Sequence, residues 1–405
     1  MDNAKMKVKV SGSVVLPQER ENLMQLDGWY TSGKFTAQFE KALSKFVGVR
    51  SVVTCNSGSS ANLLAMSALT AKELGERRLI PGDEVITAAC GFPTTINPII
   101  QVGAVPVFVD VDIPSYNTTL ERLQAALSYK TKAVILAHTL GRPYAVKEIS
   151  EWCKENNLWL IEDCCDALGG DVGKYGDMAT CSFFPAHNIT CGEGGAVFTD
   201  NLQLAKIAKS YRDWGRDCWC LPGSDNTCGK RFTTGYDHKY TYSRIGYNLQ
   251  MTDMQAAVGC AQFEMLPTFN ETRVHNFNRL LEGIQDLTDV FILPEYVEGM
   301  IPFGFPLTCK GERRPVEAFL NENEIMTRPI FAGNIIRHGY LDKYGVNYRV
   351  SGELTNSDTV YERSFWTGCY HGLNDEQIDY SIEKLREYAH SLRFNRSRVI
   401  GKVIK

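Results

Sequence analysis

The stretch that decides the fold is SFFPAHNITCGEGGA, residues 182–196. At its centre is His187, and an imidazole exchanges a proton near neutral pH, as a general base must. The glycines that follow lead into residues 194–199, a short apolar run that predicts a buried strand. We therefore expect a titratable base to be held directly before a strand of the main sheet.

Short apolar runs alternate with helical patterns on the N-terminal side of this stretch. The runs predict strands at residues 51–55, 84–88, 105–109, 133–137 and 159–161, and the helical patterns fall at 39–46, 95–102, 120–127 and 146–156. Such alternation predicts an α/β fold with a mainly parallel sheet covered by helices. Ligands of these sheets gather at the carboxyl ends of the strands. Phe92, His138 and Asp163 each follow a strand end, so we expect one pocket to receive all three.

The remaining chain divides into a loop and a second region. Residues 214–243 are irregular and rich in Gly and Cys, and a helix at 202–211 precedes them. Helices and shorter strands follow after residue 252. A chain of 405 residues allows two or three domains. We predict a large domain at residues 1–255, with an N-terminal arm and the loop, and a small C-terminal α+β domain at 256–405.

Composition excludes several classes of protein. The formal net charge of −4 lacks the basic footprint of a nucleic-acid-binding protein. Residues 1–5 lead into no apolar run, and no segment approaches the roughly 20 apolar residues that span a bilayer. We expect a cytoplasmic protein with no membrane or nucleic-acid partner. Thirteen cysteines are many for such a chain, and unusual cysteine spacing there indicates metal or redox chemistry.

One small-residue turn has the arrangement of an anion site. Asn56 to Ser60 separates a predicted strand from a predicted helix, so free backbone N–H groups and the helix dipole face one point. Gly58 and Ser59, together with Ser182, would suit a phosphate. Taken alone, the turn is more typical of an ordinary Gly/Ser loop.

The other parts of a pyridoxal phosphate (PLP) type site follow in order. Such cofactors need a side chain on the ring face, an acid at the pyridine nitrogen and a base at C4′. Phe92 suits the ring face, Asp163 the ring nitrogen and His187 the base. Asp163 alone would also fit a helix cap, but its combination with His187 favours the cofactor interpretation.

Several stretches together resemble a known family. They are GFPTT (91–95), EDCCDALG (162–169), the His187 stretch, DWGRDC (213–218), GYDHKYTY (235–242), GYNL (246–249) and FAGN (331–334). They resemble the DegT/DnrJ/EryC1/StrS sugar aminotransferase superfamily, and within it the iron–sulfur-containing nucleotide-sugar 3-dehydrases. The resemblance covers nearly the whole chain. It implies an aspartate-aminotransferase-like fold (PLP fold type I) and a homodimer with active sites at the interface.

The resemblance also implies roles for particular residues. In the aminotransferases a lysine that binds PLP covalently stands where this chain has His187. Imidazole forms no stable imine, so the departure implies a non-covalently held pyridoxamine phosphate (PMP). Asp166 would lie beside the ring oxygen or amine, and Asn248 would reach the phosphate bound by the neighbouring subunit.

A group of cysteines is the second hallmark of the resemblance. Cys218 and Cys220 are followed by Cys228 in a C-x-C-x₇-C pattern, and the resemblance implies Cys165 as the fourth ligand of a [2Fe–2S] cluster. By spacing alone, a tetrahedral zinc site is equally plausible. The segment after Cys165 is shorter than in the family, and Cys164 is the alternative ligand.

The implied function is PMP-dependent C3 dehydration of a nucleotide-linked 4-keto-6-deoxyhexose, such as CDP-4-keto-6-deoxy-D-glucose, in 3,6-dideoxyhexose synthesis. Electrons for the reduction would come through the cluster from a separate NADH-dependent flavin/iron–sulfur reductase, since the chain has no G-x-G-x-x-G fingerprint. Three alternatives remain: a cluster-free 3-dehydratase of the colitose-pathway type, a nucleotide-sugar aminotransferase, and a non-catalytic zinc- or cofactor-binding regulator. The residues do not distinguish CDP, dTDP and GDP.

Overall fold

The computed structural model describes residues 6–218, 220, 226–229, 231–233 and 235–403. Residues 1–5, one basis for expecting a cytoplasmic protein, lie outside this part of the chain.

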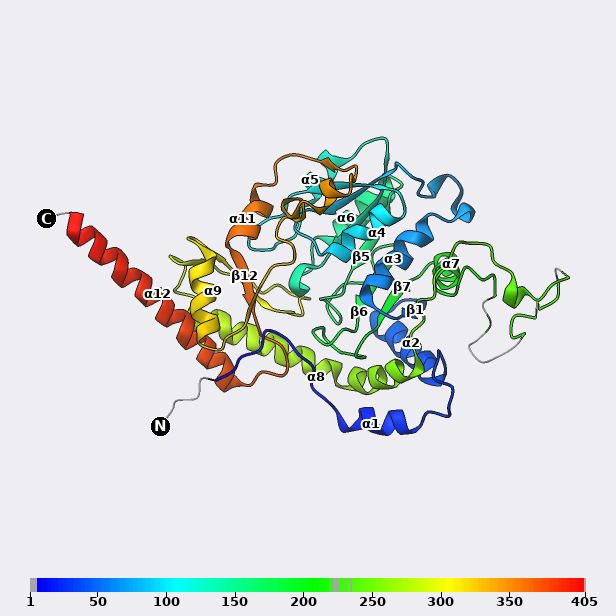
Figure 1. Ribbon diagram of the computed structural model, residues 1–405, viewed down its shortest axis with the longest axis horizontal. Helices are drawn as coiled ribbons and strands as arrows, with labels where there is room; N and C mark the ends of the chain where they lie inside the picture. The colour runs from blue at the N-terminus through cyan, green and yellow to red at the C-terminus, as the bar shows by residue number, and fades with distance from the viewer. Residues whose placement is uncertain (1–5, 219, 221–225, 230, 234, 404–405) are drawn as a thin grey trace.

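The large sheet forms around the predicted apolar runs (Figure 1). Across the described residues it contains eight strands in the order β1-β7-β6-β5-β4-β2-β3-β11. Their bounds are β1 Ser51–Cys55, β2 Glu84–Ala88, β3 Val105–Val109, β4 Thr131–Ala137, β5 Trp159–Asp163, β6 Met178–Ser182, β7 Gly195–Thr199 and β11 Arg349–Val350. Every strand predicted from an apolar run is confirmed to within two residues at each end.

The sheet is mainly parallel. The pairs from β11 through β3, β2, β4 and β5 to β6 all run parallel, whereas β7 is antiparallel to both β6 and β1. Strand β6 was not predicted, because MATCS carries no continuous apolar run. It is nevertheless buried along its whole length, with Met178 facing one core and Ala179 and Cys181 facing another.

Helices cover both faces of the sheet. In the N-terminal part they are α1 Pro17–Met24, α2 Lys34–Val47, α3 Gly58–Leu69, α4 Pro93–Gln101, α5 Leu120–Ala126, α6 Val146–Glu155 and α7 Leu202–Arg212, with short 3-10 turns at Lys72–Arg77, Thr139–Gly141 and His238–Tyr240. One core joins α3 and α7 to the sheet, and a second joins α2 and α8 (Asp253–Ile284) to the opposite face. The predicted helices are confirmed, with ends that differ by a few residues.

The C-terminal part builds a second, antiparallel sheet. Its strands follow the order β10-β12-β9-β8, with bounds β8 Phe291–Ile292, β9 Phe305–Cys309, β10 Thr327–Pro329 and β12 Ser364–Thr367. The helices there are α9 Arg313–Glu322, α10 Tyr340–Lys343, α11 Thr355–Arg363 and α12 Asp375–Val403, with a 3-10 turn at Ile335–His338.

Helix α8 connects the two parts. Figure 1 shows it running from α12 at one end to α1 and α2 at the other, and it contacts all three. The predicted boundary at 255/256 falls inside this helix, and β11 returns to the large sheet beside β3. The division at that residue therefore stays a prediction. Across the described ranges, no helix is both long and apolar enough to cross a membrane.

One histidine beneath α8 is held without a polar partner. The His371 ring stacks on Phe269 with centroids 3.9 Å apart, and neither ring nitrogen has a hydrogen-bond partner among the described residues. Burial, and then the charge of Arg273, lower the pKa of His371 to about 3. The folded protein therefore keeps this ring neutral at pH values at which an unfolded chain would protonate it.

We predict that His371→Phe makes the fold less sensitive to mild acid. Between the ordinary histidine pKa near 6.5 and about 3, the unfolded wild-type chain binds a proton that the folded protein does not, so stability falls as pH falls. From pH 6.5 to 5 the variant should lose about 1–2 kcal/mol less free energy of unfolding than the wild type. Urea unfolding at each pH measures this, with His390→Phe at an exposed histidine as control. Parallel curves for His371→Phe and wild type would contradict the assignment.

Candidate active site

A cavity of about 700 Å³ lies at the carboxyl ends of the parallel strands. Most of the predicted site residues line it: Gly58, Ser59, Phe92, Asp163, Cys165, Asp166, Ser182 and His187. His138 lines it as well, so Phe92, His138 and Asp163 do share one pocket. Residues that the sequence did not single out for this pocket also contribute, among them Ser57, Thr95, Phe303, Phe331 and Trp366.

The turn before α3 forms a cradle of backbone groups. Ser57 caps the helix, and its hydroxyl accepts a hydrogen bond from the Ser60 backbone N–H at 3.1 Å. A Cβ added to Gly58 would lie 2.4 Å from the Cβ of Ser182, and one added to Gly195 would lie 2.3 Å from the Ser57 carbonyl oxygen. Only glycine fits at these two close approaches. Ser57, Gly58 and Ser59 line the cavity at the helix N-terminus together with Ser182, and a helix N-terminus is an arrangement that binds anions.

Asp163 ends β5 with its carboxylate held by three donors. One oxygen accepts from Asn62 Nδ2 at 2.9 Å and Thr95 Oγ1 at 2.7 Å, and the other accepts from the Cys165 backbone N–H at 3.2 Å. The side chain is buried but lines the cavity. The carboxylate is therefore fixed where it can face a protonated ring nitrogen. Asn62 and Thr95 carried no sequence signal for this role.

His187 lies at the end of a turn that directs it into the cavity. Its backbone N–H donates to the Phe184 carbonyl at 3.0 Å, and its Nδ1 lies 3.4 Å from an Asp166 carboxylate oxygen. The ring also packs against Phe303, with centroids 5.3 Å apart. Among the described residues that line the cavity there is no lysine, and Arg328 is the one arginine. The chain thus offers a paired imidazole here and no amine for an imine.

A buried carboxylate lies under the wall of the cavity. Glu162 accepts hydrogen bonds from the backbone N–H groups of Gly173, Tyr175 and Gly176 at 2.7–2.8 Å, and its Oε2 lies 3.2 Å from His138 Nε2. Burial raises the pKa of Glu162, but His138 and these N–H groups outweigh it and hold the pKa below its usual range. Ligand atoms of His138, Glu162 and Cys164 lie close enough together to be considered as a metal site. Backbone N–H groups occupy both Glu162 oxygens, so we assign this group a structural role.

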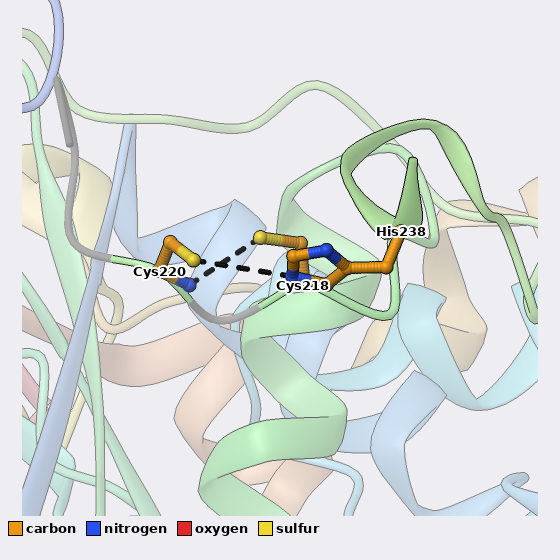
Figure 2. A group of neighbouring side chains, drawn as sticks. All are labelled: Cys218, Cys220 and His238. Carbon is orange, nitrogen blue, oxygen red and sulfur yellow. Dashed lines mark hydrogen bonds between the residues drawn. The ribbon is translucent and has the colours of Figure 1, made fainter. Parts of the chain in front are cut away.

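The cysteine-rich loop brings together three cysteines and a histidine, which we call the thiol group (Figure 2). Ligand atoms of Cys218, Cys220 and His238 lie within 4.8 Å of one another. Cys228 joins them, with its Sγ 3.5 Å from Cys220 Sγ and 3.0 Å from His238 Nε2. Burial raises the pKa of Cys220, but hydrogen bonds from Thr227, Cys228 and Cys218 lower it to about 6 overall. Three thiols and an imidazole are ligands that zinc and iron prefer.

Cys165 lines the cavity, whereas Asn248 lies outside the cavity of its own chain. Cys165 is not part of the loop group: its backbone is tied to Asp163, and its Sγ is 3.1 Å from the Cβ position of Gly58, inside the cavity wall. The alternative ligand Cys164 faces the core under α2 and α8. Asn248 does not line the cavity of this chain, because its backbone bridges to Asp213 and its side chain is exposed.

The chain is similar to one protein family over most of its length and to several curated proteins. It matches the DegT/DnrJ/EryC1/StrS aminotransferase family over residues 18–386. It is 53% identical over 401 residues to the lipopolysaccharide biosynthesis protein RfbH of Salmonella typhimurium strain LT2, covering 94% of this chain and 91% of that protein. It is 48% identical over 401 residues to a dTDP-4-dehydro-2,6-dideoxy-D-glucose 3-dehydratase of Saccharopolyspora spinosa, covering 94% and 86%.

Solved structures give the same picture of the fold. The E. coli GDP-4-keto-6-deoxy-D-mannose-3-dehydratase with bound hydrated PLP superposes with a TM-score of 0.86 at 28% identity, covering 94% of this chain and 100% of that one. Together with the mainly parallel sheet, this likeness confirms the predicted aspartate-aminotransferase-like α/β class.

We predict that Glu162→Gln destabilises the protein by about 2–4 kcal/mol. The change removes the charge opposite His138 and replaces one acceptor oxygen with an NH₂ group that faces backbone N–H donors. Urea unfolding at pH 7 measures the loss, and Glu151→Gln on the exposed face of α6 is the matched control. Equal stability of Glu162→Gln and wild type would show that the carboxylate does not hold this wall.

Proposed function

The chain belongs to the DegT/DnrJ/EryC1/StrS aminotransferase family, and on that premise we propose that it is a PMP-dependent nucleotide-sugar 3-dehydrase. Its substrate would be a nucleotide-linked 4-keto-6-deoxyhexose, with CDP-4-keto-6-deoxy-D-glucose as our first choice. The observation that carries the proposal is a cavity whose base is His187, paired with Asp166, and whose described lining contains no lysine. An aminotransferase of this family would need that lysine.

The residues of the cavity fit the cofactor. The N-terminus of α3 and the Ser182 hydroxyl suit the phosphate, and the Asp163 carboxylate suits the pyridine nitrogen. Phe92 follows β2 with its ring half exposed, where it can cover a flat ligand. When bound, such a cofactor supplies an amine for a sugar ketone and a ring that accepts electrons. The similar E. coli 3-dehydratase was solved with hydrated PLP bound, which supports this assignment.

The chemical work of the chain then lies with the His187 imidazole. Its Nδ1 faces Asp166, so Nε2 is the nitrogen left to take a proton from the cofactor C4′. The protonated ring could next donate to the departing C3 hydroxyl. A neighbouring carboxylate stabilises an imidazolium and orients its ring, so Asp166 would support both steps. We assign Asp166 to this pairing as well as to the cofactor.

We further propose that the active enzyme is a homodimer. Asn248 is exposed and away from the cavity of its own chain, which supports a role at the phosphate of a neighbouring subunit. The loop around it also exposes large apolar side chains, among them Phe232, Tyr242 and Ile245, the last with 95% of its surface exposed. A second copy covering the loop would remove this apolar surface from water.

For the reductive half, we propose that Cys218, Cys220 and Cys228 bind a [2Fe–2S] cluster with Cys165 as fourth ligand. Four thiolates are the usual ligand set of such a cluster. The approach of the three loop thiols supports the site, and a separate NADH-dependent flavin/iron–sulfur reductase would supply the electrons. His238 is the competing fourth ligand, because its Nε2 lies 3.0 Å from Cys228 Sγ. Cys165 lines the cavity and is not among the ligand atoms gathered in the loop, which favours, as second candidate, a cluster-free 3-dehydratase.

We predict that His187→Asn abolishes proton transfer while cofactor and substrate still bind. Loss of a general base should slow exchange of the C4′ proton of bound PMP by ~10²–10⁴-fold. Exchange is followed by mass spectrometry of PMP in deuterated buffer with the sugar nucleotide present, and PMP affinity by absorbance. His390→Asn, at an exposed histidine, is the control. Exchange at the wild-type rate in His187→Asn would mean that another residue is the base.

We predict that Cys228→Ser separates the two half-reactions. Oxygen is a poor substitute for sulfur at a soft site, so the cluster should be lost, as iron and sulfide analysis after anaerobic reconstitution would show. The variant should still exchange the C4′ proton but form no 3-deoxy product with reductase and NADH. Cys260→Ser is the control, because Cys260 belongs neither to the group of loop thiols nor to the cavity lining.

The same preparations identify the fourth ligand. Cys165→Ser should lose the cluster and His238→Gln should keep it, whereas the reverse pattern would assign His238. Equal 3-deoxysugar formation by Cys228→Ser and wild type would reject the cluster and leave the cluster-free dehydratase as the better interpretation.

A further inference from the structure

Helix α8 places an arginine in the core directly behind His187. Arg273 is fully buried, and among the described residues no carboxylate oxygen lies within 4.0 Å of its guanidinium. Burial lowers the pKa of Arg273 to about 10, yet that value keeps the group charged at neutral pH. A buried cation without an ion-pair partner is costly. Such a residue requires an explanation beyond packing.

The guanidinium joins the two segments that enclose the His187 ring. Its Nη2 donates to the His187 carbonyl oxygen at 3.0 Å, and its Nη1 donates to the carbonyl oxygens of Pro302 at 3.3 Å and Phe303 at 3.1 Å. The Phe303 ring in turn packs on the His187 ring. One planar group therefore fixes both the backbone that carries the imidazole and the ring against which the imidazole rests.

A second residue of α8 supports the same segment one turn earlier. Asn270 accepts a hydrogen bond from Asn188 Nδ2 and donates one to the Leu168 carbonyl oxygen, both at 3.2 Å. Residues three apart share one face of a helix, so Asn270 and Arg273 act from the same side. Leu168 closely follows Asp166, and Asn188 follows His187. The two partners of the imidazole–carboxylate pair are thus tied to one helix.

The charge of Arg273 also acts on this pair. Asp166 is among the groups whose attraction raises the pKa of Arg273 against the effect of burial. Arg273 is therefore coupled to the His187–Asp166 pair by charge as well as by its hydrogen bond to the His187 carbonyl oxygen. An Asp166 carboxylate oxygen lies 3.4 Å from His187 Nδ1, and this position disfavours the tautomer in which Nδ1 carries no hydrogen.

We propose that Arg273 is the positioning residue that sets the orientation and tautomer of His187. It does not line the cavity itself and acts through the carbonyl groups of His187, Pro302 and Phe303 and through its attraction to Asp166. The inference rests on the proposed function where it concerns catalysis, but the orientation and tautomer of His187 concern the protein alone.

Arg273→Lys is the variant that tests the proposal. Lysine keeps the charge but not the planar fork, so it cannot hold the three carbonyl groups with the same geometry. We expect C4′ proton exchange to slow by ~10²-fold, the usual effect of a misplaced catalytic group, while KM for the sugar nucleotide and Kd for PMP change less than about twofold. Arg279→Lys is the matched control, because Arg279 lies on α8 in an exposed pair with Asp379.

A second measurement needs neither cofactor nor substrate. Long-range ¹H–¹⁵N spectra of histidine-labelled protein, with His187→Asn for assignment, report which ring nitrogen carries the proton. We expect the Nδ1–H form in the wild type and in Arg279→Lys, and a mixture of forms in Arg273→Lys. Arg273→Lys with wild-type exchange and an unchanged His187 signal would overturn the proposal.

The two proposals fail in different ways. If the wild type exchanges no C4′ proton with any 4-keto sugar nucleotide, the proposed function fails, and the spectra still decide what Arg273 does. If the wild type exchanges and Arg273→Lys changes KM rather than kcat, the arginine contributes to binding and the positioning role is rejected.

Discussion

The wall of the active-site cavity depends on one buried carboxylate, that of Glu162. Successive residues of a strand face opposite sides of the sheet, so Glu162 faces the core side while Asp163 faces the cavity. Glu162 accepts three backbone N–H groups of residues 173–176 and contacts His138. This network closes the irregular segment between β5 and β6, and Cys165 and Asp166 lie near the start of that segment. The position of Asp163 and Asp166 thus depends on a carboxylate that does not line the cavity.

The other side of the cavity depends on the long helix α8. It packs against α1 and α2 in the N-terminal part and against α12 in the C-terminal part. Through Asn270 and Arg273 it also holds the turn that carries His187 and the carbonyl group of Phe303. His187 and Phe303 therefore come from different parts of the chain, but the same helix holds the backbone of both. In the proposed mechanism, that support keeps the imidazole in place while the sugar nucleotide enters.

The cavity and the thiol group of the loop are separate features. The cavity uses the ends of β5 and β6 and the start of α3, whereas the thiol group belongs to the loop beyond α7, which Figure 1 shows extending away from the sheet. In the proposed function, dehydration requires only the first feature, and reduction requires both. The substitution of His187 for the lysine that the resemblance implies is what separates this chain from an aminotransferase. The thiols concern only how the product is reduced.

The sequence alone determined the alternation of strands and helices, because apolar runs bounded by small and polar residues report burial directly. It also indicated Asp163 and His187, whose chemistry stands out at the end of a strand and before a glycine-rich turn. It missed β6, where MATCS has no continuous apolar run, although both of its faces are buried. It missed the donors that hold Asp163, since Asn62 and Thr95 are 101 and 68 residues away. Arg273 lies 86 residues beyond the carbonyl that it holds, and Cys165 lies beside Gly58 in the cavity wall. Such contacts depend on how the elements pack, and only the tertiary structure decided them.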